Sequence, residues 1–229
     1  MNWAWLPEYL PLFAKGVWLT IQLLVLSMVF GLVLAVPVGL VQVTGPRWLA
    51  AISKGYCTVM RGTPLLVQLW LLYFGLGSVF AAYPEVRQSM FWPILREGYF
   101  YALLSFTLNE AGYGGEIMRG AFLSVPKGEL EAARAYGMSP WKVLHRIWLP
   151  RALRNVLPTL AGETVLMLKA TPLAATVTVL DIFGVVTRVR QNTYLTYEPL
   201  IAGAILYMVL TFIITRAFSQ VENQIPSRQ

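Results

Sequence analysis

The stretch GVWLTIQLLVLSMVFGLVLAVPVGLVQVTGP, residues 16–46, contains no charged side chain and decides the fold class. A helix needs roughly 20 apolar residues to cross the hydrocarbon core of a bilayer, so this stretch is long enough for one tilted span. The whole chain agrees, because 57% of its 229 residues are hydrophobic and only 13% are charged. We therefore predict an all-α integral membrane protein, since helices satisfy their backbone hydrogen bonds within each span.

Five transmembrane helices are predicted from the apolar stretches and the charges that bound them. They cover approximately residues 17–43, 50–82, 98–121, 155–180 and 199–218, within a single membrane domain of residues 1–229. An odd number of spans places the two termini on opposite faces of the membrane.

The basic residues between the spans predict the orientation. Residues 44–61, residues 119–154 and the C-terminus fall on one side and carry most of the Lys and Arg residues. Cytoplasmic loops carry such an excess, so we place this side in the cytoplasm and the N-terminus outside. The formal net charge of +7 comes from Lys and Arg residues between the spans, and these do not form one basic face with aromatic residues. The bilayer is therefore the expected partner, and nucleic acid is not.

Several kinds of site are not expected. Cys57 is the sole cysteine, which rules out an intrachain disulfide, a CxxC pair and a cysteine-based metal cluster. The sequence has no nucleophile elbow, no metal-binding His or Asp triad and no phosphate-binding GxxxxGK[ST] loop. The N-terminus lacks a basic region and a cleavage site typical of a signal peptide. We therefore expect no catalytic residue, no metal and no nucleotide on this chain.

Residues 124–150 are predicted to form a charged helical hairpin on the cytoplasmic side. Ser124 is expected to cap the first helix, and Gly137 to end it, because glycine tolerates the left-handed turn. Ser139 and Pro140 are expected to begin a second helix that ends at Pro150. Such a hairpin could dock a soluble partner or lie on the membrane surface, and both readings stay open.

Two carboxylates are predicted inside the membrane. Glu163 follows Arg154 by nine residues, which places it roughly 13 Å above the inner interface, and Glu110 falls at a similar depth. Inserting an ionisable side chain at such a depth costs roughly 2.5–3.5 kcal/mol of free energy, so each of the two carboxylates requires a structural or functional explanation. A cationic substrate would find compensating charge there; alternatively, the carboxylates neutralise a partner's basic residue or accept hydrogen bonds only.

The predicted third span carries further polar residues. Asn109, Tyr113 and Glu116 share one helix face and could either line a pathway or hold helices together. Glu116 and Arg119 are three residues apart near the inner surface, so we expect a local ion pair between them, or contact with residues 47–61, rather than substrate binding.

The hairpin resembles a known family. The order Glu131, Ala132, Ala133, three residues, Gly137, nine residues, Ile147, one residue, Leu149, Pro150 matches the EAA loop of permease subunits of bacterial ABC importers. MRGTPLLVQL at 60–69 and LMLKATPLA at 166–174 look like the polar amino acid importers. Residues 163–182 are most similar to the M-type subunit of histidine, lysine/arginine/ornithine or opine transporters.

The resemblance implies a type I ABC importer permease fold in the bacterial inner membrane, with a periplasmic N-terminus and a cytoplasmic C-terminus. It implies a second permease subunit, favouring a paralogue, with two ATPase subunits that bind ATP and Mg²⁺, and a periplasmic binding protein. The seven EAA-loop residues would then couple the hairpin to the ATPase. Glu163, Glu110, Asn109, Tyr113 and Thr171 are our candidates for the substrate pathway, although Pro172 departs from the family's Thr-Ser-Leu pattern.

The function expected from this resemblance is ATP-driven import of a polar, cationic amino acid or opine by alternating access. Import of a neutral or acidic polar amino acid is the alternative. An intramembrane enzyme using Glu110 and Glu163 as acid and base is a less favoured alternative, because the sequence has no metal triad, nucleophile elbow or phosphate-binding loop. A passive channel would not need the hairpin.

Overall fold

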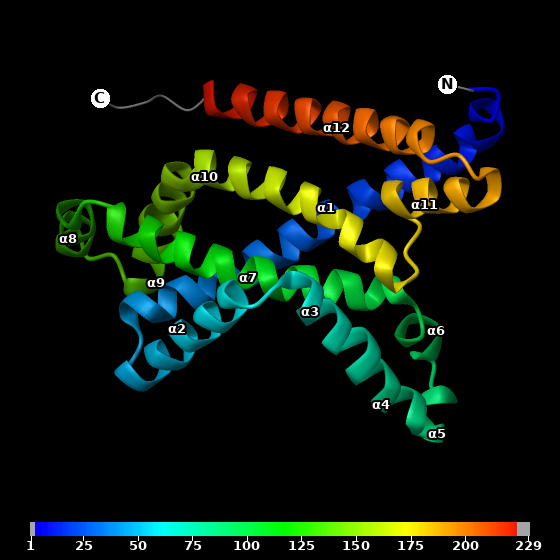
Figure 1. The fold of residues 1–229 in the computed structure, drawn as a ribbon. Coiled ribbons are helices and arrows are strands. Elements are labelled where there is room, and N and C mark those ends of the chain that lie inside the picture. The colour runs from blue at the N-terminus through cyan, green and yellow to red at the C-terminus, as the bar shows by residue number, and fades with distance from the viewer. Residues whose placement is uncertain (1–2, 224–229) are drawn as a thin grey trace. The chain divides into compact units, whose positions relative to one another are not determined.

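The structure is a computed structural model that describes residues 3–223, and these residues contain helices and no strand (Figure 1). Four helices are long: α1 (Leu6–Thr44), α7 (Gly98–Ser124), α10 (Leu149–Ala170) and α12 (Tyr197–Asn223). The shorter helices are α2 (Arg47–Gly62), α3 (Leu65–Trp70), α4 (Gly77–Ala82), α5 (Pro84–Arg87), α6 (Trp92–Leu95), α8 (Lys127–Ala135), α9 (Pro140–Val143) and α11 (Ile182–Thr193). Leu71–Leu76 and Leu144–Trp148 are π-helical, and Thr171–Val177 is a 3₁₀ helix.

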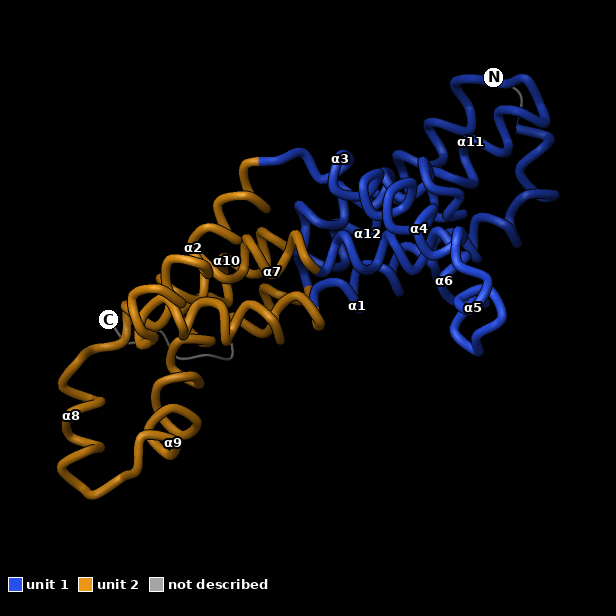
Figure 2. Tube along the Cα trace, turned by 90° about the horizontal axis from the view of Figure 1, so that it is seen from below, with its two compact units in different colours: residues 1–28, 63–107, 164–216 blue, residues 29–62, 108–163, 217–229 orange. Residues whose placement is uncertain are grey.

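The chain divides into two compact units (Figure 2). The first unit takes residues 1–28, 63–107 and 164–216, and the second takes residues 29–62, 108–163 and 217–229. Each unit has an apolar core of its own. The core of the first includes Leu23, Phe106 and Ile182, whereas that of the second includes Met118 and Phe122.

Close helix packing in the second unit depends on small residues. A Cβ on Gly39 of α1 would lie 2.8 Å from the backbone of α7, at Gly115 O and Arg119 N. A Cβ on Gly112 would lie 2.5 Å from the Cβ of Met60 on α2. Because Gly39 and Gly112 have no side chain, α1 and α2 can approach α7 closely, as small residues allow between membrane helices.

Length and composition single out three helices of the described chain as able to cross a membrane. They are Leu6–Thr44, Leu65–Ala82 and Tyr197–Glu222, and a fourth results if Pro140–Val177 and Ile182–Thr193 are taken as one bent span. The predicted span 98–121 coincides with α7, whose polar residues lower its hydropathy while about half of its side chains are buried. The five-span count stays a prediction.

Two predicted spans are not continuous α-helices. In the stretch predicted at 50–82, the helix breaks at residues 63–64, because the residue before a proline avoids the helical region. Pro64 itself has ψ of 131° and precedes the first residue of α3. In the stretch predicted at 155–180, the α-helix ends at Ala170, where the chain tightens to the 3₁₀ helix and then turns at Thr178, with φ of 69°.

The hairpin follows the prediction at its turn but not at its ends. Gly137 has φ of +75°, and Ser139 precedes Pro140 at the start of α9. Ser124, however, does not cap α8: it is the last residue of α7, and its hydroxyl donates to the carbonyl of Ala121 at 2.8 Å. Pro126 occupies the N-cap position of α8 instead.

Pro150 does not end the second hairpin helix, which continues into α10. A proline inside an α-helix removes one hydrogen bond and clashes with the carbonyl four residues earlier. The chain avoids this by widening into a π-helical turn over Leu144–Trp148, in which Leu149 N–H donates to Leu144 O. The hairpin is therefore continuous with the helix that carries Glu163.

Candidate functional site

The two carboxylates predicted inside the membrane both belong to the second unit. Glu110 lies on α7 with 1% of its surface exposed, and its Oε1 has no hydrogen-bond partner among the described residues. Glu163 lies on α10 and is partly exposed. Glu163 is close enough to interact electrostatically with Glu110 and with Arg61, the penultimate residue of α2. The second unit thus gathers two carboxylates and one guanidinium from three helices.

The polar face of α7 contacts the end of α2. Asn109 Nδ2 donates to Met60 O at 3.2 Å, and Tyr113 OH lies 3.5 Å from Arg61 O. The Arg61 guanidinium lies 5.7 Å from the centre of the Tyr113 ring, within cation–π range. These contacts favour the reading in which Asn109 and Tyr113 hold helices together.

The ion pair predicted between Glu116 and Arg119 is confirmed, with 2.9 Å between Arg119 Nη2 and Glu116 Oε2. It satisfies both charges locally on α7.

Thr171 belongs to the first unit and is fully buried. Its hydroxyl donates to Leu168 O at 2.8 Å and lies 3.4 Å from Tyr207 OH. Tyr207 OH in turn donates to Asp181 Oδ2 at 2.9 Å. Sequence reasoning missed Asp181 and Tyr207, although an Asp directly before an apolar helix is a recognisable cap signal; here Asp181 Oδ1 accepts from Gly184 N at 2.8 Å.

The EAA-loop residues of the hairpin divide by exposure. Glu131, Ala132 and Gly137 are exposed, whereas Ala133 is buried in the core of the second unit. The others are partly buried: Ile147, Leu149 and Pro150. The hairpin therefore presents one open face and is anchored by the opposite one.

Large aromatic side chains add to the open face of the hairpin. Tyr136, beside the turn, is 89% exposed, and Trp141 on α9 is 68% exposed. Trp141 contacts the His145 ring at 3.7 Å between centroids. Exposed aromatics are common at the centres of protein interfaces, so these residues, absent from our sequence-based set, extend the candidate docking face.

Polar contacts join the elements at the base of the hairpin. Glu129 on α8 accepts two hydrogen bonds from Arg151 on α10, at 2.6 and 3.0 Å. Hydrogen bonding to this carboxylate raises the pKa of the Arg151 guanidinium. Trp148 Nε1 also donates to Phe122 O at 2.9 Å, so the end of α7 is held as well.

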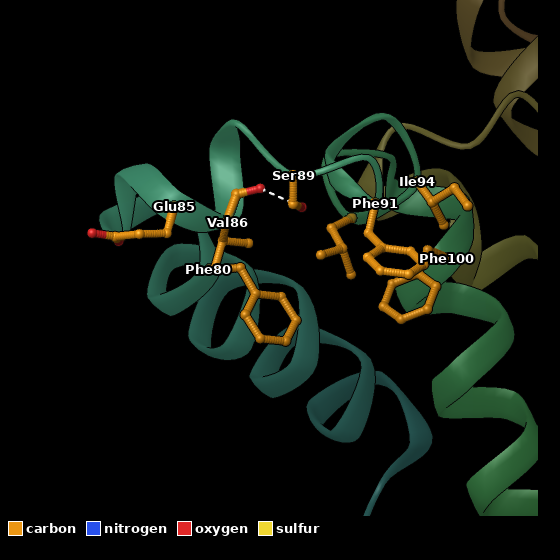
Figure 3. Close-up of a pocket in the computed structure, with 8 residues that line it drawn as sticks. Phe80, Glu85, Val86, Ser89, Phe91, Ile94 and Phe100 are labelled. Carbon is orange, nitrogen blue, oxygen red and sulfur yellow. Dashed lines mark hydrogen bonds between the residues drawn. The ribbon is translucent and has the colours of Figure 1, made fainter.

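A cavity of about 590 Å³ lies in the first unit, beside the connection between α4 and α7 (Figure 3). Ser89, one of its few polar residues, donates its hydroxyl to Val86 O at 2.7 Å. None of the sequence-predicted site residues lines it. The lining is mostly apolar: Phe80, Glu85, Val86, Ser89, Phe91, Ile94, Leu95 and Phe100.

No group of three or more His, Cys, Asp or Glu residues able to hold a metal ion occurs in the part of the chain that the structure describes.

Comparison with known proteins gives consistent matches. The sequence profile of the binding-protein-dependent transport system inner membrane components matches residues 27–225. The octopine transport system permease protein OccM of Rhizobium radiobacter is 41% identical over 208 residues, covering 91% of this chain and 83% of the relative. The histidine/lysine/arginine/ornithine transport system permease protein HisM of Escherichia coli (strain K12) is 36% identical over 210 residues, covering 91% and 87%.

Solved structures share the fold. A crystal structure of an amino acid ABC transporter with histidines matches with a TM-score of 0.82 at 27% identity, over 98% of this chain and 99% of the other. The inward-facing MetNI methionine ABC transporter matches with a TM-score of 0.75 at 20% identity, over 94% and 97%. The second likeness concerns the fold alone.

Proposed function

The chain belongs to the family of binding-protein-dependent transport system inner membrane components, and on this premise we propose that it carries a cationic amino acid or an opine across the membrane. Relatives are permease proteins of octopine, nopaline and histidine/lysine/arginine/ornithine transport systems. The observation that carries the substrate class is the pair of carboxylates, Glu110 and Glu163, in one unit of a membrane chain.

The substrate pathway in this proposal passes Glu163, which is partly exposed and can face a cation. Glu110 adds negative potential from α7, and a charge inside a membrane acts strongly because little water screens it. Asn109 and Tyr113 support the pathway by fixing the end of α2. Thr171 would act from the first unit, where its hydroxyl is part of a buried network.

The chain works with ATPase subunits and a binding protein, as importers of this family do. We propose that ATP and Mg²⁺ bind the partner ATPase, and that the hairpin docks there through Glu131, Ala132 and the turn at Gly137. Closure of the ATPases would then move the membrane helices between inward-facing and outward-facing states. The resemblance to the M-type subunit favours a paralogue as the second permease.

Reconstitution tests this function directly. Proteoliposomes holding this permease, its partner permease and the ATPase should hydrolyse ATP faster when the loaded binding protein is added, and should accumulate lysine or arginine rather than glutamine or glutamate. Accumulation of a neutral or acidic amino acid alone would overturn the cationic assignment. Neither an intramembrane enzyme nor a passive channel predicts ATP hydrolysis stimulated by a binding protein.

The proposed orientation can be tested by labelling. Tyr136→Cys places a thiol on the exposed hairpin, while the native Cys57 is buried. An impermeant maleimide should label this thiol in inside-out vesicles that carry the permease without its ATPase, and not in intact cells. Labelling of intact cells would overturn a cytoplasmic hairpin.

A further inference from the structure

The hairpin and the helix that carries Glu163 are joined in two ways. The covalent route runs from α8 through the Gly137 turn and α9 into the π-helical segment, which continues into α10. The second route is the contact between Glu129, in the first turn of α8, and Arg151, in the first turn of α10. The two routes run within residues 127–163, all of which belong to the second unit (Figure 2).

The ion pair between Glu129 and Arg151 is bidentate, which restricts sliding of α8 along α10. Arg151 Nε lies 3.0 Å from Glu129 Oε2, and Arg151 Nη2 lies 2.6 Å from Glu129 Oε1. Two parallel bonds from a planar guanidinium fix orientation as well as distance, which a single bond or a lysine would not do. Both side chains are about one-third exposed, 33% for Glu129 and 35% for Arg151, so solvent screens them only in part.

The apolar contacts of α8 do not provide the same constraint. Leu130 and Ala133 are buried in the core of the second unit, and their packing holds α8 against its neighbours. Apolar packing of this kind has no fixed donor–acceptor direction, whereas a bidentate ion pair does. The ion pair adds the missing directional link to α10.

Motion at α10 reaches the candidate substrate site. Glu163 follows Arg151 on the same helix by twelve residues, roughly 18 Å along the axis. We propose that Glu129 and Arg151 are positioning residues that make α8 and α10 move as one body, so that movement of the docked hairpin reaches Glu163. This inference rests on the proposed docking of the hairpin on the ATPase.

Charge exchange tests the proposal in the complete reconstituted transporter. Glu129→Arg and Arg151→Glu should each lower the amount of lysine imported per ATP hydrolysed by roughly tenfold, because each places like charges together. The double variant carrying both changes should recover most of the loss. Recovery would not occur if either residue acted by contacting the ATPase itself. Arg96→Glu, which breaks the exposed ion pair of Arg96 with its neighbour Glu97, should leave import unchanged.

The outcomes separate this inference from the proposed function. If the single changes leave import per ATP unchanged, or if the double variant is no better than the single ones, the positioning role is wrong. If Gly137→Asp still uncouples import in that case, the docking assignment stands. Where charge reversal keeps the chain from the membrane, Arg151→Lys and Glu129→Gln serve instead: each should lower import per ATP severalfold, and wild-type values for both would overturn the role.

Discussion

At the base of the hairpin, both carboxylate oxygens of Glu129 accept hydrogen bonds from the Arg151 guanidinium. On α7 of the same unit, by contrast, Glu110 is buried and its Oε1 has no hydrogen-bond partner among the described residues. The first carboxylate is satisfied by the protein and serves its architecture. The second is expensive to bury, because desolvation of a polar group without a partner is unfavourable. The difference teaches that two carboxylates of one unit can have different roles: Glu129 is paired and structural, whereas Glu110 adds negative potential near Glu163.

The largest effect is expected at the hairpin turn. Gly137 has φ of +75°, a conformation that aspartate as well as asparagine can adopt, and Gly137→Asp adds a negative charge to the docking face. Binding-protein-dependent import should fall roughly tenfold or more while the chain still reaches the membrane. Gly137→Asn is the control, since asparagine tolerates this conformation and adds no charge. Normal import by Gly137→Asp would contradict coupling through the hairpin.

The stability of variants at Glu110 and Glu129 tests the comparison between these two carboxylates. Glu110→Gln should leave the free energy of unfolding unchanged or raise it by about 1–3 kcal/mol, because no hydrogen bond to Oε1 is lost. Glu129→Gln should lower it, since the ion pair is lost. Thermal unfolding in detergent measures both. If Glu110→Gln destabilises the protein as Glu129→Gln does, the contrast between the two carboxylates fails.

A smaller effect is expected at Asn109. Asn109→Leu removes the bond to Met60 O, worth about 0.5–1.5 kcal/mol, and should loosen the end of α2 beside Arg61. Import should fall a few-fold with little change in abundance. Thr58→Val is the matched control because it removes a bond within α2 alone. If Asn109→Leu and Thr58→Val import equally well, Asn109 does not contribute to the candidate site.

The smallest effect is expected at Tyr113. Its hydroxyl lies 3.5 Å from Arg61 O, at the limit of a hydrogen bond, so Tyr113→Phe should change import less than about twofold. Tyr113→Leu removes the ring near the Arg61 guanidinium and should have the larger effect. A strong loss in Tyr113→Phe would mean that the hydroxyl itself contacts the substrate.

Local signals made much of the fold predictable. The uncharged run at 16–46 lies within α1 except for its last two residues, and the positive φ of Gly137 follows from glycine's tolerance of that conformation. The misplaced boundaries have local causes too. Thr63 and Pro64 interrupt the stretch 50–82, which the prediction treats as one helix. Pro150 is accommodated by a π-helical turn, which no residue pattern predicts.

The candidate site was only partly predictable. Counting the helical rise from the inner interface predicts a similar depth for Glu110 and Glu163, and the structure places both residues in the second unit. Pairing could not be read from the sequence, because Glu129 and Arg151 are 22 residues apart and meet only when the hairpin folds back. The network of Asp181 and Tyr207 was missed for the same reason.

The central claim is that Glu163 serves a cationic substrate, and its most direct test is the initial rate of lysine uptake into proteoliposomes by Glu163→Gln. Wild type and variant would be compared at equal abundance, with the same ATPase and saturating binding protein. The account predicts a fall of roughly tenfold, since the variant lacks the compensating charge. Lysine uptake at the wild-type rate would contradict it.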